Sequence, residues 1–160
     1  MKRISKLSLI AVAAFLLLGS LPVRAIERPF ALNGRGASTF ITDEAGNPIG
    51  ANVTTSGTGT HLGVFTSAGK VNFTPDPVTG RLLSSGAGTL IAANGDQLKF
   101  EVNGALEVDP DTNTGTDRAI FRFTGGTGRF AGASGQANGV VVVNLLTGAF
   151  ELTMVGNIDY

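Results

Sequence analysis

The sequence has 160 residues, a formal net charge of zero, no cysteine, no tryptophan, one histidine and 23 glycines. Without cysteine there are no disulfides, thiolate nucleophiles, iron–sulfur clusters or cysteine-bound zinc. One histidine excludes a multi-histidine metal site within one chain, and the lack of a basic excess gives no reason to expect a nucleic-acid partner.

Residues 1–25 are predicted to be a secretory signal peptide. Three basic residues precede an apolar run over 7–18, and residues 23–25 place small side chains at a cleavage site after Ala25. An uncleaved anchor is the alternative, but the run is shorter than the about 20 residues that a spanning helix needs. We expect export to the periplasm or the medium. Residues 26–160 would form a single domain that keeps eight basic and twelve acidic residues, a net charge of −4.

The rest of the chain is predicted to be all-β. Apolar and polar residues alternate over 98–103, 118–123 and 150–155, which is the period of a strand with one buried face. No window shows apolar residues at helical spacing over three turns. About eight strands are expected, near 33–42, 54–66, 69–74, 84–92, 97–107, 118–124, 135–144 and 149–158.

Tight turns are expected between these strands at 67–69, 94–96 and 146–148. The pair Asn94-Gly95 is typical of a two-residue hairpin turn. Consecutive hairpins indicate an antiparallel meander, which either closes as a small β-barrel or folds as a sandwich. Glycines inside several strands favour the strongly curved barrel.

The glycine-rich segment over 123–136 is similar to a phosphate-binding loop only in composition. The dinucleotide-binding fingerprint would need glycine where Ala131 stands, and no Lys-Ser or Lys-Thr pair follows. We instead expect a shaped turn in which Phe130 fills part of the core. The residues of this predicted structural turn are Gly125, Gly126, Gly128, Phe130, Gly132 and Gly135.

The stretch over 125–135 resembles the GGTGxFxxAxG stretch of plant dirigent proteins and the related GGxGxFxGxxG stretch of allene oxide cyclases. Two further stretches, 57–66 and 92–98, are similar to those of short exported bacterial proteins of unassigned role. The resemblance implies an eight-stranded antiparallel barrel of the allene oxide cyclase and dirigent type. It also implies a homo-oligomer, a trimer or a dimer. It carries no catalytic residue onto this chain, because no motif matches those sites.

His61 is the candidate ligand-binding residue, since it is the only imidazole. On a strand over 54–66 its face would be shared with Gly59 and Gly63, which leave room for a ligand. The alternative is structural: the same glycines let another segment pack closely while the imidazole is hydrogen-bonded to backbone.

The loop over 109–117 spaces oxygen donors at alternate positions, a pattern found in calcium-binding loops. The candidate calcium ligands are Asp109, Asp111, Asn113 and Asp117. The EF-hand pattern fails, because Thr114 and Ile120 stand where glycine and glutamate are required, and a solvated connection has the same composition. Elsewhere, Glu101 and Arg122 are expected to form a cross-strand ion pair on the outer face.

The last strand also permits a different class of protein. Apolar residues alternate from Phe150 to Tyr160, as in the C-terminal strand of a bacterial outer-membrane barrel. Against this alternative, aromatic girdles need tyrosine and tryptophan, and the chain has one tyrosine and no tryptophan.

These observations predict an exported, soluble β-barrel with no cofactor and no recognisable catalytic constellation. Its expected partner is a small apolar or amphipathic ligand held at the barrel mouth, or another protein that meets its oligomer surface. The enzyme alternative is a cofactor-free isomerase or cyclase that confines a reactive substrate. Such an enzyme would need a polar trio inside the barrel, for which His61, Glu101 and Asn103 are the candidates.

Overall fold

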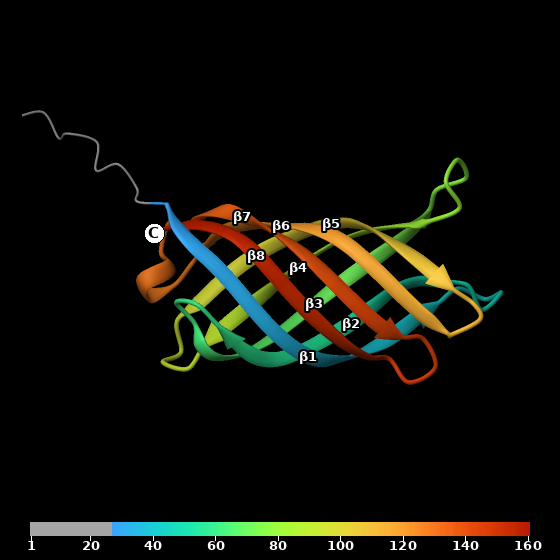
Figure 1. Ribbon diagram of the computed structural model, residues 1–160, viewed down its shortest axis with the longest axis horizontal. Coiled ribbons are helices and arrows are strands. Elements are labelled where there is room, and N and C mark those ends of the chain that lie inside the picture. Colours follow the sequence, from blue (N-terminus) through green and yellow to red (C-terminus); the bar gives the residue numbers. More distant parts are fainter. Residues whose placement is uncertain (1–26) are drawn as a thin grey trace, which may run out of the picture.

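Eight antiparallel strands form one closed barrel in the computed structural model, which describes residues 27–160 (Figure 1). Each strand pairs with the next along the chain, and β8 pairs with β1. The elements are β1 (Arg28–Thr42), β2 (Pro48–Gly59), β3 (Gly63–Pro75), β4 (Leu82–Ala92), β5 (Gln97–Asp109), β6 (Thr114–Gly126), the 3-10 turn η1 (Gly128–Phe130), β7 (Ser134–Asn144) and β8 (Ala149–Asp159).

The predicted all-β, eight-stranded antiparallel barrel is thus confirmed, and the sandwich alternative is wrong. The predicted signal peptide lies outside the described residues. None of residues 27–160 belongs to a helix long and apolar enough to span a membrane.

One predicted turn is in the wrong place. The chain reverses at 60–62, inside the strand expected over 54–66, because His61 and Gly63 adopt positive φ angles of 64° and 67°. The small residues over 67–69, expected to turn, lie within β3 and pair with β2 and β4. At Gly69 a Cβ atom would lie 2.9 Å from the carbonyl oxygen of Ala87, so this glycine permits close strand approach and makes no turn. The turns at 94–96 and 146–148 are where they were predicted.

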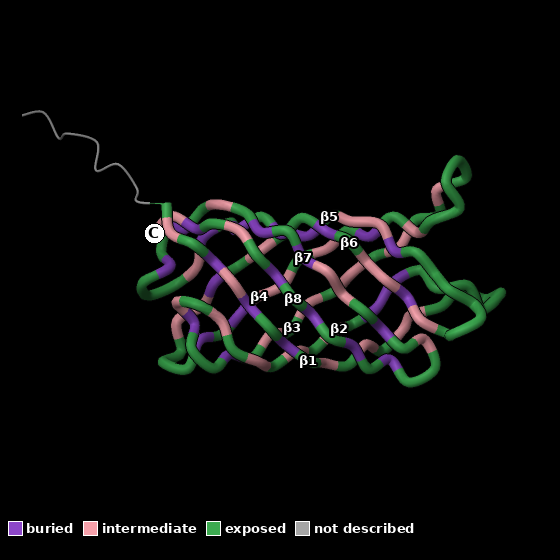
Figure 2. Tube along the Cα trace, viewed as in Figure 1, coloured by how far each residue is buried: buried purple, intermediate pink, exposed green. Residues whose placement is uncertain are grey.

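Side chains alternate between the barrel interior and the outer wall, as Figure 2 shows along each strand. On β6, Ala119, Phe121 and Phe123 are buried, while Arg118 and Arg122 are exposed. The interior is therefore apolar. The apolar alternation of the last strand belongs to this inner surface, since Phe150, Leu152, Met154 and Ile158 are all buried.

The two ends of the barrel differ. The end that carries the β2–β3, β4–β5 and β6–β7 connections, at the left of Figure 1, is filled by large apolar side chains, and we call it the packed end. The end that carries the other four hairpin loops is called the open end. At the packed end η1 inserts Phe130, which is 0% exposed, and Phe30 meets Phe123 edge-on with ring centroids 4.7 Å apart. The fully buried large side chains include Phe30, Phe65, Phe130, Leu62, Leu98 and Ile158.

The glycine-rich turn has the backbone geometry that such an insertion needs. Gly125, Gly128, Gly132 and Gly135 all have positive φ angles, between 58° and 120°. L-residues with a side chain rarely adopt this region. The segment can therefore bend sharply enough to direct Phe130 back into the barrel.

Candidate functional site: an apolar cavity in the open half of the barrel

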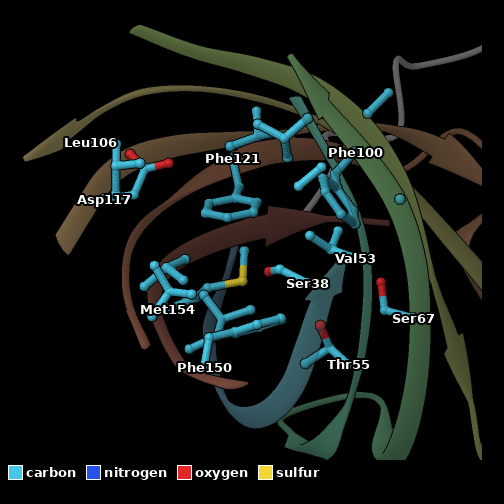
Figure 3. Close-up of a pocket in the computed structure, with 18 of the residues that line it drawn as sticks. Ser38, Val53, Thr55, Ser67, Phe100, Leu106, Asp117, Phe121, Phe150 and Met154 are labelled. Carbon is cyan, nitrogen blue, oxygen red and sulfur yellow. The ribbon is translucent and has the colours of Figure 1, made fainter. Parts of the chain in front are cut away.

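A cavity of about 100 Å³ lies inside the barrel, and side chains from all eight strands line it (Figure 3). Only four of its 21 lining residues have polar side chains, so its surface is mainly apolar. Those four are Ser38, Thr55, Ser67 and Asp117. Phe40, Val71 and Phe73, which line it toward the open end, are only partly buried. Solvent therefore reaches the cavity from the open end.

Phenylalanine rings packed over glycines keep this space from being filled. Phe100 lies over Gly88, where an added Cβ would meet the ring at 2.5 Å, and Phe150 lies over Gly36 in the same way. In both cases the glycine faces the phenylalanine across a strand pair. The missing side chain gives the ring a place against the barrel wall, as in aromatic–glycine pairs of other sheets. The rings cover the wall and leave the centre of the barrel empty.

Asp117 is the only charged residue that lines the cavity. It stands on β6 opposite Leu106 of β5, and its side chain turns toward Gly104. A Cβ atom at Gly104 would lie 2.6 Å from Asp117 Oδ1, so the carboxyl group occupies the space that this glycine leaves. Ser84, which is 3% exposed, pairs with Gly104 from the other side.

Burial raises the pKa of Asp117 above its usual value, because the cavity wall removes water from the charged form. The Ser84 hydroxyl and the backbone N–H of Ala105 act in the opposite direction, but more weakly. Even so, Asp117 Oδ1 and Ser84 Oγ are both buried without a hydrogen bond of good geometry. The cavity lining therefore includes a carboxyl group, that of Asp117, whose hydrogen-bonding capacity is not fully used.

A strip of polar side chains lies across the cavity from Asp117. Ser38 comes from β1, Thr55 from β2 and Ser67 from β3, and Thr55 is the direct cross-strand partner of Ser67. Figure 3 shows these hydroxyl groups on the far side of the cavity from the carboxyl group of Asp117. An elongated molecule lying across the cavity would meet apolar side chains along most of its length and polar groups at its ends.

His61 does not belong to this site. It lies in the β2–β3 turn at the packed end, where its Nε2 is 3.0 Å from the carbonyl oxygen of Pro29. Its ring also meets Tyr160 edge-on, at 5.5 Å between centroids. These contacts agree with the structural interpretation of His61. Its predicted position on a strand face was wrong, because the chain turns at this residue.

The four candidate calcium ligands are not brought together. A hydrogen bond from the Thr112 side chain lowers the pKa of Asp109 most. The backbone N–H groups of Asp111 and Thr112, which donate to Asp109 Oδ1 at 3.0 and 3.4 Å, lower it further. Asn113 turns the loop at a φ of 52°, whereas Asp117 faces the barrel interior. Among residues 27–160, no three histidine or acidic side chains gather around one point. Calcium binding by the exposed part of the loop stays a prediction.

The other polar candidates face outward. Glu101 and Asn103 are exposed, and Glu101 pairs in register with Arg122, but the two side chains form no ion pair within 4 Å. The polar trio proposed from the sequence is therefore not inside the barrel. The ion pairs that the described residues do form are Arg35–Glu151, Arg81–Glu107 and Arg129–Asp96.

The cavity residues could have been found from strand alternation. The alternation that places Ala119 and Phe121 inside, continued two residues back, places Asp117 on the same face. Because the loop over 109–117 is acidic, Asp117 was interpreted as a candidate calcium ligand instead. Ser84 carries no comparable sequence signal, because serine is common on both faces of a strand.

Comparisons with protein-family models, with curated proteins and with solved structures find no match for this chain. The eight-stranded barrel is the fold that the allene oxide cyclase and dirigent resemblance implies, but unrelated families share such a barrel. Family membership stays a prediction, and the functional argument rests on the cavity itself.

Proposed function

We propose that this protein binds a small, largely apolar molecule in the open half of its barrel. The observation that carries the proposal is the cavity of about 100 Å³ inside a barrel whose other end is filled by large buried apolar side chains. An apolar protein cavity of about 150 Å³ is enough to hold benzene. This cavity is smaller, so the enclosed part of the ligand is no larger than one ring, for example a short alkyl chain, and a longer molecule would extend through the open end.

The side-chain distribution supports a barrel surrounded by water over the outer-membrane alternative. Transmembrane barrels have an apolar outer face and a polar interior. Here the interior is apolar, and charged residues such as Arg35, Lys70, Lys99 and Glu101 are exposed on the outer wall. Export and assembly into an oligomer are retained as parts of the proposal on the sequence arguments alone.

Binding is favoured over catalysis because the cavity offers one titratable group. An isomerase or cyclase would need a second polar group near the reacting atoms, and the hydroxyl groups of Ser38, Thr55 and Ser67 lie across the cavity from Asp117. The cavity is better suited to holding a molecule than to transferring its protons between two groups.

The proposal is tested with two variants, one that fills the cavity and one that places the same side chain on the outer wall. Ser67→Leu adds an apolar side chain into the cavity, whereas Thr66→Leu adds the same group to the outer wall, since Thr66 is exposed and Ser67 lines the cavity. With 1-hexanol as probe, we expect amide chemical-shift changes at cavity residues such as Val102 and Met154 in the parent protein and in Thr66→Leu. Ser67→Leu should lose them.

Thermal unfolding of both variants checks that each is folded. If 1-hexanol shifts amides away from the cavity, or if folded Ser67→Leu binds it as the parent does, the cavity is not the binding site.

A further inference from the structure

The polar groups of the cavity restrict the chemistry of its ligand, and this step rests on the proposed function. Asp117 is the only charged side chain among the lining residues, and no basic side chain lines the cavity to balance it. Its neighbour Arg118 is exposed on the outer wall. A carboxylate in apolar surroundings is stabilised only by an opposite charge or by hydrogen-bond donors. A cationic hydrogen-bond donor in the cavity would therefore stabilise the charged form of Asp117.

The surroundings of Asp117 show which hydrogen bonds are missing. Asp117 Oδ1 and Ser84 Oγ are both buried and unpartnered. They belong to strands β6 and β4, with Gly104 of β5 between them, and the absent side chain at Gly104 leaves the space in which Oδ1 lies. Both atoms can accept a hydrogen bond. Asp117 lines the cavity and Ser84 does not, so the carboxyl group is the acceptor that faces a ligand.

We propose that Asp117 determines the specificity of the cavity and that the ligand is a small primary amine, whose ammonium group pairs with Asp117 while its apolar body fills the cavity. An ammonium group has three N–H donors and no acceptor, which matches a carboxylate that has no basic side chain beside it in the cavity lining. Hydrogen bonds between ionised partners are roughly twice as strong as neutral ones, so an alcohol of the same size binds more weakly. A carboxylate ligand brings a second negative charge beside Asp117 and binds more weakly still.

The test uses three probes with one six-carbon body and different head groups: hexylamine, 1-hexanol and hexanoate. Dissociation constants are measured at pH 7 and constant ionic strength by calorimetry or by NMR titration. We expect hexylamine to bind about tenfold more tightly than 1-hexanol, and hexanoate about tenfold more weakly, each factor corresponding to one charge-assisted interaction gained or lost.

Asp117→Asn separates this inference from general attraction of cations. The variant should bind hexylamine no more tightly than 1-hexanol, so the ratio of the two dissociation constants falls to about one. Asp111→Asn is the matched control, because Asp111 is an exposed acid on the β5–β6 loop of the open end. It should keep the full preference for hexylamine.

Three results would overturn the inference while leaving the binding cavity in place. One is equal affinity of the parent for hexylamine and 1-hexanol, with 1-hexanol in the cavity. Another is a preference for the amine that survives in folded Asp117→Asn. The last is an equal loss in Asp111→Asn. Failure of every probe to shift cavity amides would reject the proposed function as well, so the two failures are distinguishable.

Discussion

The packed end and the open end are built from the same eight strands, and the difference between them lies in their connections. At the packed end the connections send apolar side chains inward: Leu62 comes from the β2–β3 turn and Phe130 from η1, and both are almost completely buried. At the open end Leu145 of the β7–β8 loop packs against the core, but it is only partly buried.

The open-end loops are stabilised within themselves. Each of the four contains an aspartate or asparagine whose side chain accepts a backbone N–H of its own loop: Asp43, Asp76, Asp109 and Asn144. Loops of this kind need no apolar anchor in the barrel. The comparison teaches that a small barrel can be packed or hollow according to its loops, with little change in its strands.

The largest expected effect is on the free energy of unfolding, and it tests whether the two ends differ in packing. Phe130→Ala at the packed end should lower the free energy of unfolding by about 3–5 kcal/mol, because it leaves a void in a fully buried cluster. Phe40→Ala at the open end should cost only about 1 kcal/mol, since Phe40 is partly exposed beside an existing cavity. Urea denaturation of both variants measures the difference. Equal losses would mean that the two ends are equally packed in solution.

A smaller effect is expected from the loop glycines. Gly128→Ala should cost about 2 kcal/mol, because its Cβ would collide with the Asp96 carboxylate and its φ is positive. That carboxylate is fixed by Arg129, whose Nε donates to it at 3.0 Å. Gly46 at the open end has a φ of 85°, and the Cβ atom added by Gly46→Ala would have no other atom within 4 Å. This substitution should cost about 1 kcal/mol, and a matching loss at the two sites would show that the contact with Asp96 is not maintained.

The smallest effect concerns the one acid of the cavity. Burial raises the pKa of Asp117, so the folded protein binds this proton more tightly than the unfolded chain does. The free energy of unfolding therefore falls as pH rises through the window from the ordinary value of 3.8 to the raised value. Because asparagine does not titrate, Asp117→Asn removes this decrease in the free energy of unfolding. It should be more stable than the parent by about 1 kcal/mol at pH 7, and the gain should vanish at acid pH.

Asp43→Asn is the control, because the pKa of Asp43 is lowered whereas that of Asp117 is raised. Hydrogen bonds, the largest from the Asn47 side chain, lower the pKa of Asp43, so its contribution is present above pH 3.8 and is lost as pH falls through the lower value. This variant should be no more stable than the parent at pH 7. Denaturation profiles of both variants against pH make the comparison, and a gain for Asp117→Asn that does not depend on pH would contradict the assigned burial of its charge.

The fold and the inward-facing residues could be predicted from local patterns, but the empty space between those residues could not. Period-two alternation over 118–123 and the Asn94-Gly95 turn were sufficient to predict strands and a hairpin. The turn at His61 was missed, because its positive φ belongs to a residue type that carries only a weak turn signal. The cavity depends on contacts between paired strands, such as that between Phe150 of β8 and Gly36 of β1, which join residues far apart in the chain.

The pairing of β8 with β1 has a further consequence. In an open sheet the two outer strands present unpaired backbone N–H and C=O groups, to which another chain can add a strand. The ring of eight described strands has no such edge. The described strands of two copies therefore cannot join by extending one another's sheets, and contacts between two such barrels have to be made by side chains of the outer wall or by the loops.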